Sequence, residues 1–253
     1  MNGFVVAVTF LTRVPTGVRI EGGRDLARSV PWLPVVGACI GAVLGAVYAL
    51  SVELWPLPVA AALTLVAGLL LTGAFHEDGL ADSADALGGG WDREQALRIA
   101  RDPTHGSYGV LAIVASFALR LLALAALPAR EGFVTLVVAH CLSRAIAVAV
   151  LGIQPAATPG GLGASYARAS TRAGVAVGSV VGLAVAGAGI GLWALVALAL
   201  ALPIVVFVVS LARRKLGGIS GDVLGAVQQI VEVAVLLVAA AVVAGEGKLI
   251  PWI

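Results

Sequence analysis

The stretch AGVAVGSVVGLAVAGAGIGLWALVALALALPIVVFVVSLA, residues 173–212, contains no charged side chain. An α-helix crosses the hydrocarbon core of a membrane, about 30 Å thick, with about 20 apolar residues. The stretch is therefore too long for one spanning helix and long enough for two. Gly187, Gly189 and Gly191 lie near its middle, where they favour a tight turn. We expect two antiparallel membrane helices joined at these glycines.

Long apolar runs also make up most of the rest of the chain. The composition is 60% hydrophobic and 12% charged, with a mean hydropathy of +1.04, whereas a soluble domain carries about 25% charged residues. Single charges, Arg120, Arg144 and Glu232, interrupt three of the other apolar runs. These considerations predict an all-α, polytopic integral membrane helical bundle of about seven spans, forming one domain over residues 1–253. The other runs are 29–52, 54–75, 103–129, 132–152 and 223–245.

The opening sequence, MNGFVVAVTFLTRVPTG, has no basic segment ahead of its apolar residues, which is unlike a secretory signal peptide. Its apolar run ends at Arg13 after about a dozen residues, too few to cross a bilayer. We expect an interfacial or re-entrant segment here.

The basic residues predict the orientation, because lysine and arginine concentrate in cytoplasmic loops. With the N-terminus in the cytoplasm and seven spans, the outside segments carry only Arg130 and Lys248. The same alternation places the polar segments on the cytoplasmic face, so we expect a multi-pass protein of the bacterial inner membrane with its active site facing the cytoplasm. The inside segments carry Arg13, Arg19, Arg24, Arg28, Arg93, Arg98, Arg101, Arg168, Arg172, Arg213, Arg214 and Lys215.

Several classes of function and site are disfavoured by the sequence. A net charge of +2, without a basic stretch interleaved with aromatic residues, argues against nucleic acid as a partner. Cys39 and Cys141 lie far apart in apolar runs, which argues against a zinc site or a disulfide framework. Membrane lipid is an expected partner, whereas a monomer and a homo-oligomer both remain open.

The chemistry is concentrated in the segment HEDGLADSAD, residues 76–85. Asp78, Asp82 and Asp85 are spaced i, i+4 and i+7, so on a helix continuous with the preceding span their carboxylates would share one face. Like charges so close repel unless a cation lies between them, and carboxylate oxygens are the ligands that magnesium prefers. Glu77 stands beside them. The spacing predicts a Mg²⁺ site for chemistry on a phosphate-linked group.

Other polar features are compatible with phosphate chemistry. Gly88–Gly90 could present backbone N–H groups to phosphate or act as a hinge. Arg101 and Asp102 precede Thr104, His105 and Ser107 at a predicted helix start, where anions are favoured.

A second set of polar groups lies at or within the predicted spans. Asp222 follows a glycine-rich turn, as a ligand or as a helix cap. Arg144 within its span either pairs with Glu232 or faces a substrate phosphate, and Arg120 is expected to snorkel towards the membrane surface.

These motifs resemble the cobalamin synthase family, the adenosylcobinamide-GDP ribazoletransferases. The resemblance rests on HEDGLADSADALGGG, RIARDPTHGSYGVLA, FLTRVP and GGISGDVLGAVQQIVE, which occur in the family's order. It implies Mg²⁺-dependent joining of α-ribazole, or its 5′-phosphate, to activated cobinamide with release of GMP. The chain departs from the family at Ser220, where threonine is common, and at Pro103–His105, which lacks a usual basic residue; His105 could contact the substrate instead.

The resemblance, together with the spacing, assigns roles by position. We expect His76, Asp82 and Asp85 to be catalytic, with Asp85 as a candidate base for the attacking ribose hydroxyl. The expected metal ligands are Glu77, Asp78, Asp82 and Asp85. The expected substrate-binding residues are Arg13, Arg101, Asp102, His105, Arg144 and Asp222.

Two other functions stay open at this stage. A phospholipid-type alcohol phosphotransferase would share Asp78-Gly79, but Asp82 stands where its arginine would follow alanine, and its final aspartate pair is missing. A cation transporter would place carboxylates near the membrane midplane, whereas these acids lie at the predicted end of a span.

Overall fold

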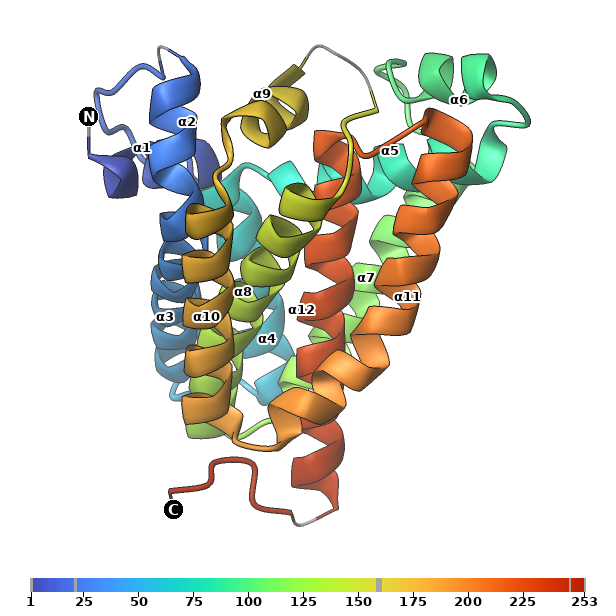
Figure 1. Ribbon diagram of the computed structural model, residues 1–253. Helices are drawn as coiled ribbons and strands as arrows, with labels where there is room; N and C mark the ends of the chain where they lie inside the picture. Colours follow the sequence, from blue (N-terminus) through green and yellow to red (C-terminus); the bar gives the residue numbers. More distant parts are fainter. Residues whose placement is uncertain (1, 21, 158–160, 246, 253) are drawn as a thin grey trace.

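The computed structural model of the chain describes residues 2–20, 22–157, 161–245 and 247–252, and it is helical almost throughout (Figure 1). A single backbone bridge between Ala156 and Ile219 is the only β-pairing among these residues. The helical elements are α1 (Gly3–Leu11), α2 (Gly23–Ser29), the 3₁₀ turn η1 (Val30–Trp32), α3 (Leu33–Val52), α4 (Leu57–Thr72), α5 (Phe75–Gly89), α6 (Arg93–Ile99), α7 (Ser107–Ala125), α8 (Ala129–Ile153), α9 (Gly161–Ala169), α10 (Arg172–Ile190), α11 (Trp193–Leu216) and α12 (Gly221–Ala244).

The predicted membrane bundle is confirmed. Within the described residues, six helices are long and apolar enough to cross a membrane, and α4 with α5 adds a seventh span if that bent pair is counted as one. The long apolar stretch divides as expected, because α10 ends at Ile190 and Gly191 adopts a φ of +57°.

One expectation about the acidic segment is wrong: α5 is not a continuation of the preceding span. The axes of α4 and α5 meet at 88°. Gly73 and Ala74 both have positive φ, +70° and +55°. A Cβ on Gly73 would lie 2.1 Å from Nε of Arg13, so the arginine packs directly on the bend. The backbone N–H of Arg13 also donates to the carbonyl of Leu71 at 2.8 Å. The FLTRVP motif thus supports the turn that swings the acidic helix across the bundle.

The short helices gather at one end of the bundle, the upper end in Figure 1, where α1, α2, α5, α6 and α9 lie. The α10–α11 turn and the C-terminal segment lie at the opposite end. The polar segments that the charge pattern placed on one face therefore do meet at one end of the molecule.

Glycines allow the spanning helices to approach closely, as is typical of membrane bundles. On α3, a Cβ at Gly37 would lie 2.3 Å from the His140 carbonyl oxygen, and one at Gly41 would lie 2.4 Å from that of Leu136. This contact matters for the site because it fixes the position of α8.

We predict that Gly37→Ala lowers the free energy of unfolding by about 1–3 kcal/mol, the usual cost of overpacking. Gly187→Ala on α10 is the matched control, because a Cβ added there would meet no atom within 4 Å, and the change should not destabilise the fold. Thermal unfolding of the detergent-solubilised variants measures both. Equal melting temperatures for the two variants would contradict the proposed close packing.

Candidate functional site

Two aspartates of α5 and a histidine from the loop before α7 form an acidic cluster, defined here as Asp78, Asp82 and His105. His105 Nε2 lies 3.8 Å from Oδ1 of Asp78, and His105 Nδ1 lies 3.5 Å from Oδ1 of Asp82. One potential ligand atom from each residue falls within 4.8 Å of the others. The i, i+4 spacing therefore brings Asp78 and Asp82 together as predicted, and His105 joins them from another segment.

The electrostatics of the cluster favour a cation. The pKa of Asp82 is raised to about 6, first by burial and then by the negative charges of Asp78 and Asp222. Asp222 comes this close because α5 and α12 touch through Gly79, whose Cβ would lie 3.0 Å from the Cα of Asp222. Three carboxylates thus converge from two helices, and a divalent ion would relieve their repulsion.

A cavity of about 370 Å³ opens beside the cluster. Its wall is mainly apolar, with Phe10, Phe75 and Tyr166 as aromatic members. Polar groups line it at a few points only, a composition typical of small-molecule sites. Those groups include His76, Asp78, Arg101, Arg144, Ser220 and Asp222.

Asp222 lines this cavity and is not the N-cap of its helix. Ser220 is the N-cap of α12, and its side chain accepts from the N–H of Val223 at 3.3 Å. The cap role that the sequence left open for Asp222 therefore belongs to Ser220.

Asp85 lies outside the cluster. It is buried, and its two carboxylate oxygens accept the backbone N–H groups of Gly106 at 2.7 Å and Gly109 at 2.9 Å. It therefore holds the first turn of α7 and the loop that carries His105. This placement does not bring Asp85 to the metal position expected for it, and it leaves a base role without geometric support.

We predict that Asp85→Asn retains at least about a tenth of the catalytic activity that the motifs lead us to expect, because an amide still accepts one of the two N–H groups. Asp85→Ala leaves both N–H groups unpaired and should cost about 1–3 kcal/mol of stability. Activity assays and melting curves of both variants test this. Loss of all activity in a stably folded Asp85→Asn protein would instead favour a general base.

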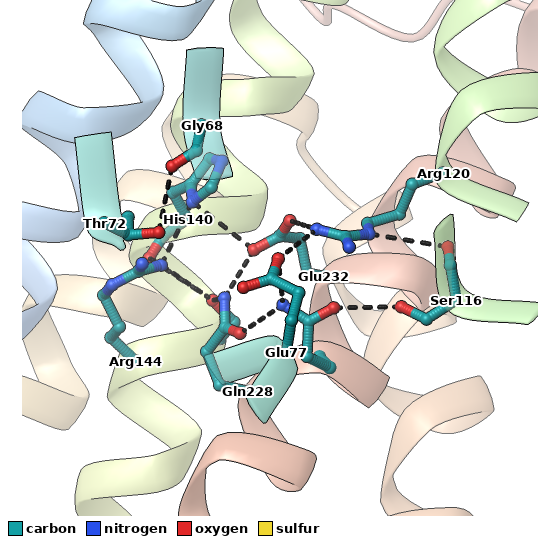
Figure 2. A network of polar contacts seen from close by, with 11 residues as sticks. Gly68, Thr72, Glu77, Ser116, Arg120, His140, Arg144, Gln228 and Glu232 are labelled. Atoms are coloured by element: carbon teal, nitrogen blue, oxygen red, sulfur yellow. Dashed lines mark hydrogen bonds and ion pairs between the residues drawn. The ribbon is translucent and has the colours of Figure 1, made fainter. Parts of the chain in front are cut away.

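Glu77 also points away from the cluster, into the membrane bundle (Figure 2). Its Oε1 accepts from Nη1 of Arg120 at 3.0 Å and from Nε2 of Gln229 at 3.2 Å. The same Arg120 nitrogen donates to Oε1 of Glu232 at 3.1 Å. Because Arg120 is buried between two carboxylates, the expectation that it snorkels is wrong. The structure likewise places Glu77 in an ion pair and not among the expected metal ligands.

Arg144 does not form the direct pair with Glu232 that was one of its two expected roles, and its role towards a substrate phosphate stays a prediction. It makes no ion pair with a carboxylate among the residues that the structure describes. Its Nη1 donates to the carbonyl of His140 at 2.9 Å and lies 3.1 Å from Nδ1 of that imidazole. His140 Nδ1 in turn lies 3.3 Å from Oε2 of Glu232. Arg144 and Glu232 are thus linked through His140, and Arg144 also lines the cavity.

The other predicted residues divide into two groups. Arg101 and the buried His76 line the cavity, and His76 stacks edge-to-face on Phe75. Arg13 and Asp102 are not among the lining residues. Asp102 is exposed and accepts from both the N–H and the hydroxyl of Thr104, which lowers its pKa. Arg13 therefore supports the bend between α4 and α5, and Asp102 supports the loop between α6 and α7.

Sequence reasoning missed several residues of this region. His140, Gln228 and Gln229 carried a usable signal, since polar side chains inside apolar runs are costly and usually functional or paired. The aromatic residues of the cavity wall carried none, because isolated phenylalanine and tyrosine residues are common in any apolar helical segment.

Comparison with known proteins matches residues 3–240 to the family model described as cobalamin-5-phosphate synthase. A protein of Bradyrhizobium diazoefficiens named adenosylcobinamide-GDP ribazoletransferase is 42% identical over 241 residues, covering 93% of this chain and 92% of the relative. Relatives of the same name from Leptothrix cholodnii and Chlorobaculum tepidum are 38% and 36% identical, covering 92% and 95% of this chain and 93% and 95% of the respective relatives. No solved structure matches the chain significantly. The chain therefore belongs to the cobalamin-5-phosphate synthase family of membrane-embedded transferases.

Proposed function

We propose that the chain is a Mg²⁺-dependent adenosylcobinamide-GDP ribazoletransferase. It joins α-ribazole, or its 5′-phosphate, to adenosylcobinamide-GDP and gives adenosylcobalamin, or its 5′-phosphate, and GMP. This reaction is a late step of cobalamin biosynthesis. The observation that carries the proposal is the acidic cluster at the edge of an apolar cavity that also presents two arginines. The names of the relatives supply the substrates.

The residues present fit a divalent cation. Asp78 and Asp82 offer hard oxygen donors, and the side chain of Asp78 is 64% exposed, so an ion and a substrate phosphate can both reach it. We propose that Asp78 and Asp82 hold the ion, with Asp222 and His105 near enough to act directly or through water. When bound, Mg²⁺ would neutralise the charge that builds on the departing GMP.

The remaining work falls to the chain's own groups. Transfer to a ribose hydroxyl requires mainly positioning and charge compensation from the protein. Arg101 and Arg144 place two cations on the cavity wall for phosphate oxygens. The aromatic and aliphatic wall suits a planar base and excludes water. Asp82 is our candidate for accepting the hydroxyl proton, because it is a carboxylate of the cluster beside the cavity, where the attacking hydroxyl and the phosphates would meet.

We further propose that the site faces the cytoplasm from the bacterial inner membrane. The support is the charge asymmetry of the loops, together with the gathering of these segments at one end of the bundle (Figure 1). A homo-oligomer would be compatible with the fold, and size measurement in detergent would show whether one forms.

A paired substrate assay tests the proposal. Purified protein receives either adenosylcobinamide-GDP with ribazole phosphate or a CDP-linked lipid with an alcohol. We expect GMP from the first pair and no CMP from the second. CMP release without GMP release would favour an alcohol phosphotransferase, and Mg²⁺ flux into proteoliposomes without either product would favour a transporter.

A further inference from the structure

Arg144 of α8 is a buried cation in the wall of the cavity, with an unsatisfied donor. The residue is only 3% exposed, yet it contributes to the lining. Its Nη1 donates to the carbonyl of His140 and to the hydroxyl of Ser143 at 3.5 Å, and it lies 3.1 Å from Nδ1 of His140. Its Nε has no hydrogen-bond partner among the described residues. A buried polar group in this state is costly and calls for an explanation.

The surrounding charges explain why Arg144 lacks a carboxylate. Both nearby buried glutamates, Glu77 and Glu232, are taken by Arg120 (Figure 2). A single atom of His140, Nδ1, lies 3.1 Å from Nη1 of Arg144 and 3.3 Å from Oε2 of Glu232. Gln228 reinforces this arrangement, because its Nε2 donates both to Ser143 and to Glu232. The network thus keeps the guanidinium from closing onto Glu232.

We propose that Arg144 binds a substrate phosphate within the cavity and that His140 is the positioning residue that keeps it available. This inference rests on the proposed function and extends it to a specific anion contact. The guanidinium of an arginine that lines the cavity suits phosphate oxygens, and such charge-assisted contacts are strong in a desolvated site. A phosphate in the cavity would give Arg144 the anionic partner that it does not have among the described residues.

Two substrates could bring this phosphate: ribazole 5′-phosphate, and the diphosphate of adenosylcobinamide-GDP. Steady-state kinetics of Arg144→Gln separates them when the KM is measured for each substrate and for unphosphorylated ribazole. We expect the KM of the substrate whose phosphate contacts Arg144 to rise at least about 30-fold, since truncating one partner of a buried charge pair has effects of this size or larger. The KM of ribazole should stay within about threefold. Arg172→Gln, an exposed change outside the cavity, is the matched control.

His140 gives a test that a merely structural role would not pass. In His140→Ala the spacer is gone, so Arg144 can close onto Glu232, and we expect the same KM to rise at least about tenfold with a smaller change in kcat. His140→Gln keeps a polar spacer of similar length and should restore most of the affinity. A uniform loss of kcat in both variants, with unchanged KM values, would overturn the positioning role.

Pyrophosphate binding provides a readout that does not depend on catalysis. Millimolar pyrophosphate should raise the Tm of the wild-type protein and of Arg172→Gln, and should leave the Tm of Arg144→Gln unchanged. Should Arg144→Gln fail to fold, Arg144→Lys keeps the charge and loses the planar fork, and the expected effects are smaller with the same pattern. An Arg144 variant with wild-type KM values and a wild-type pyrophosphate shift would overturn the proposal. Absence of GMP release by the wild-type protein would instead refute the proposed function, while the Tm comparison would still decide on Arg144.

Discussion

Asp82→Asn should lower the kcat for GMP release by roughly 10³-fold while the protein still folds and inserts. The substitution keeps the shape of the side chain and removes one charge from the acidic cluster. Nδ1 of His105 lies 3.5 Å from Oδ1 of Asp82, and the negative charges of Asp78 and Asp222 act on the same carboxylate. Asp82 therefore lies at the centre of the proposed metal site. Loss of charge stabilisation worth several kcal/mol corresponds to a rate effect of about this size.

Glu53→Gln is the control for this variant, because it removes an exposed carboxylate at the far end of α3 from the site. It should leave kcat unchanged. The two proteins should also have similar melting curves, since Asp82 makes no structural hydrogen bond among the described contacts. An Asp82→Asn enzyme that keeps more than about a tenth of the wild-type kcat would rule out Asp82 as an essential metal ligand or base.

Arg120→Met should be the most destabilising single substitution considered for this chain. It leaves Glu77 and Glu232 buried without their common cation. Breaking a buried ion pair by removing one partner typically costs about 3–5 kcal/mol, because the remaining charge is uncompensated. We therefore expect a large drop in the unfolding midpoint, or failure to accumulate in the membrane.

A triple variant separates the contribution that the Arg120 charge makes to stability from the contribution of its packing. Combining Arg120→Met with Glu77→Gln and Glu232→Gln removes the unpaired carboxylates and should recover at least half of the lost stability. Arg130→Met, an exposed arginine at the start of α8, is the matched control and should be neutral. No recovery in the triple variant would mean that the arginine stem contributes through packing and not through its charge.

The helical spans could be predicted from the sequence because they depend on run length and hydropathy alone. The closeness of Asp78 and Asp82 could also be predicted, because their common face follows from helical spacing within one short segment. Their neighbours could not be assigned in this way. Glu77 is adjacent in sequence to Asp78, but the helix turns it into the bundle, where its partner Arg120 is 43 positions away.

Asp85 illustrates a second limit. Its i+7 spacing from Asp78 is compatible with a shared metal, yet the start of α7 supplies two N–H groups that bind it instead. That outcome depends on the bend at Gly73 and Ala74, which sets where α5 runs. Ala74 gives no signal for a positive φ, and the packing of Arg13 on Gly73 joins segments that are distant in the chain. Long-range contacts of this kind decided which acids could meet.

The central claim is that the acidic cluster holds Mg²⁺ for a GMP-releasing transfer. The most direct measurement is GMP release by the purified protein from adenosylcobinamide-GDP and ribazole phosphate while Mg²⁺ is titrated from a metal-free, EDTA-treated start. We predict no release without the metal, a saturable rise with Mg²⁺, and a weaker apparent Mg²⁺ affinity in Asp78→Asn. Full-rate GMP release in EDTA would contradict the claim.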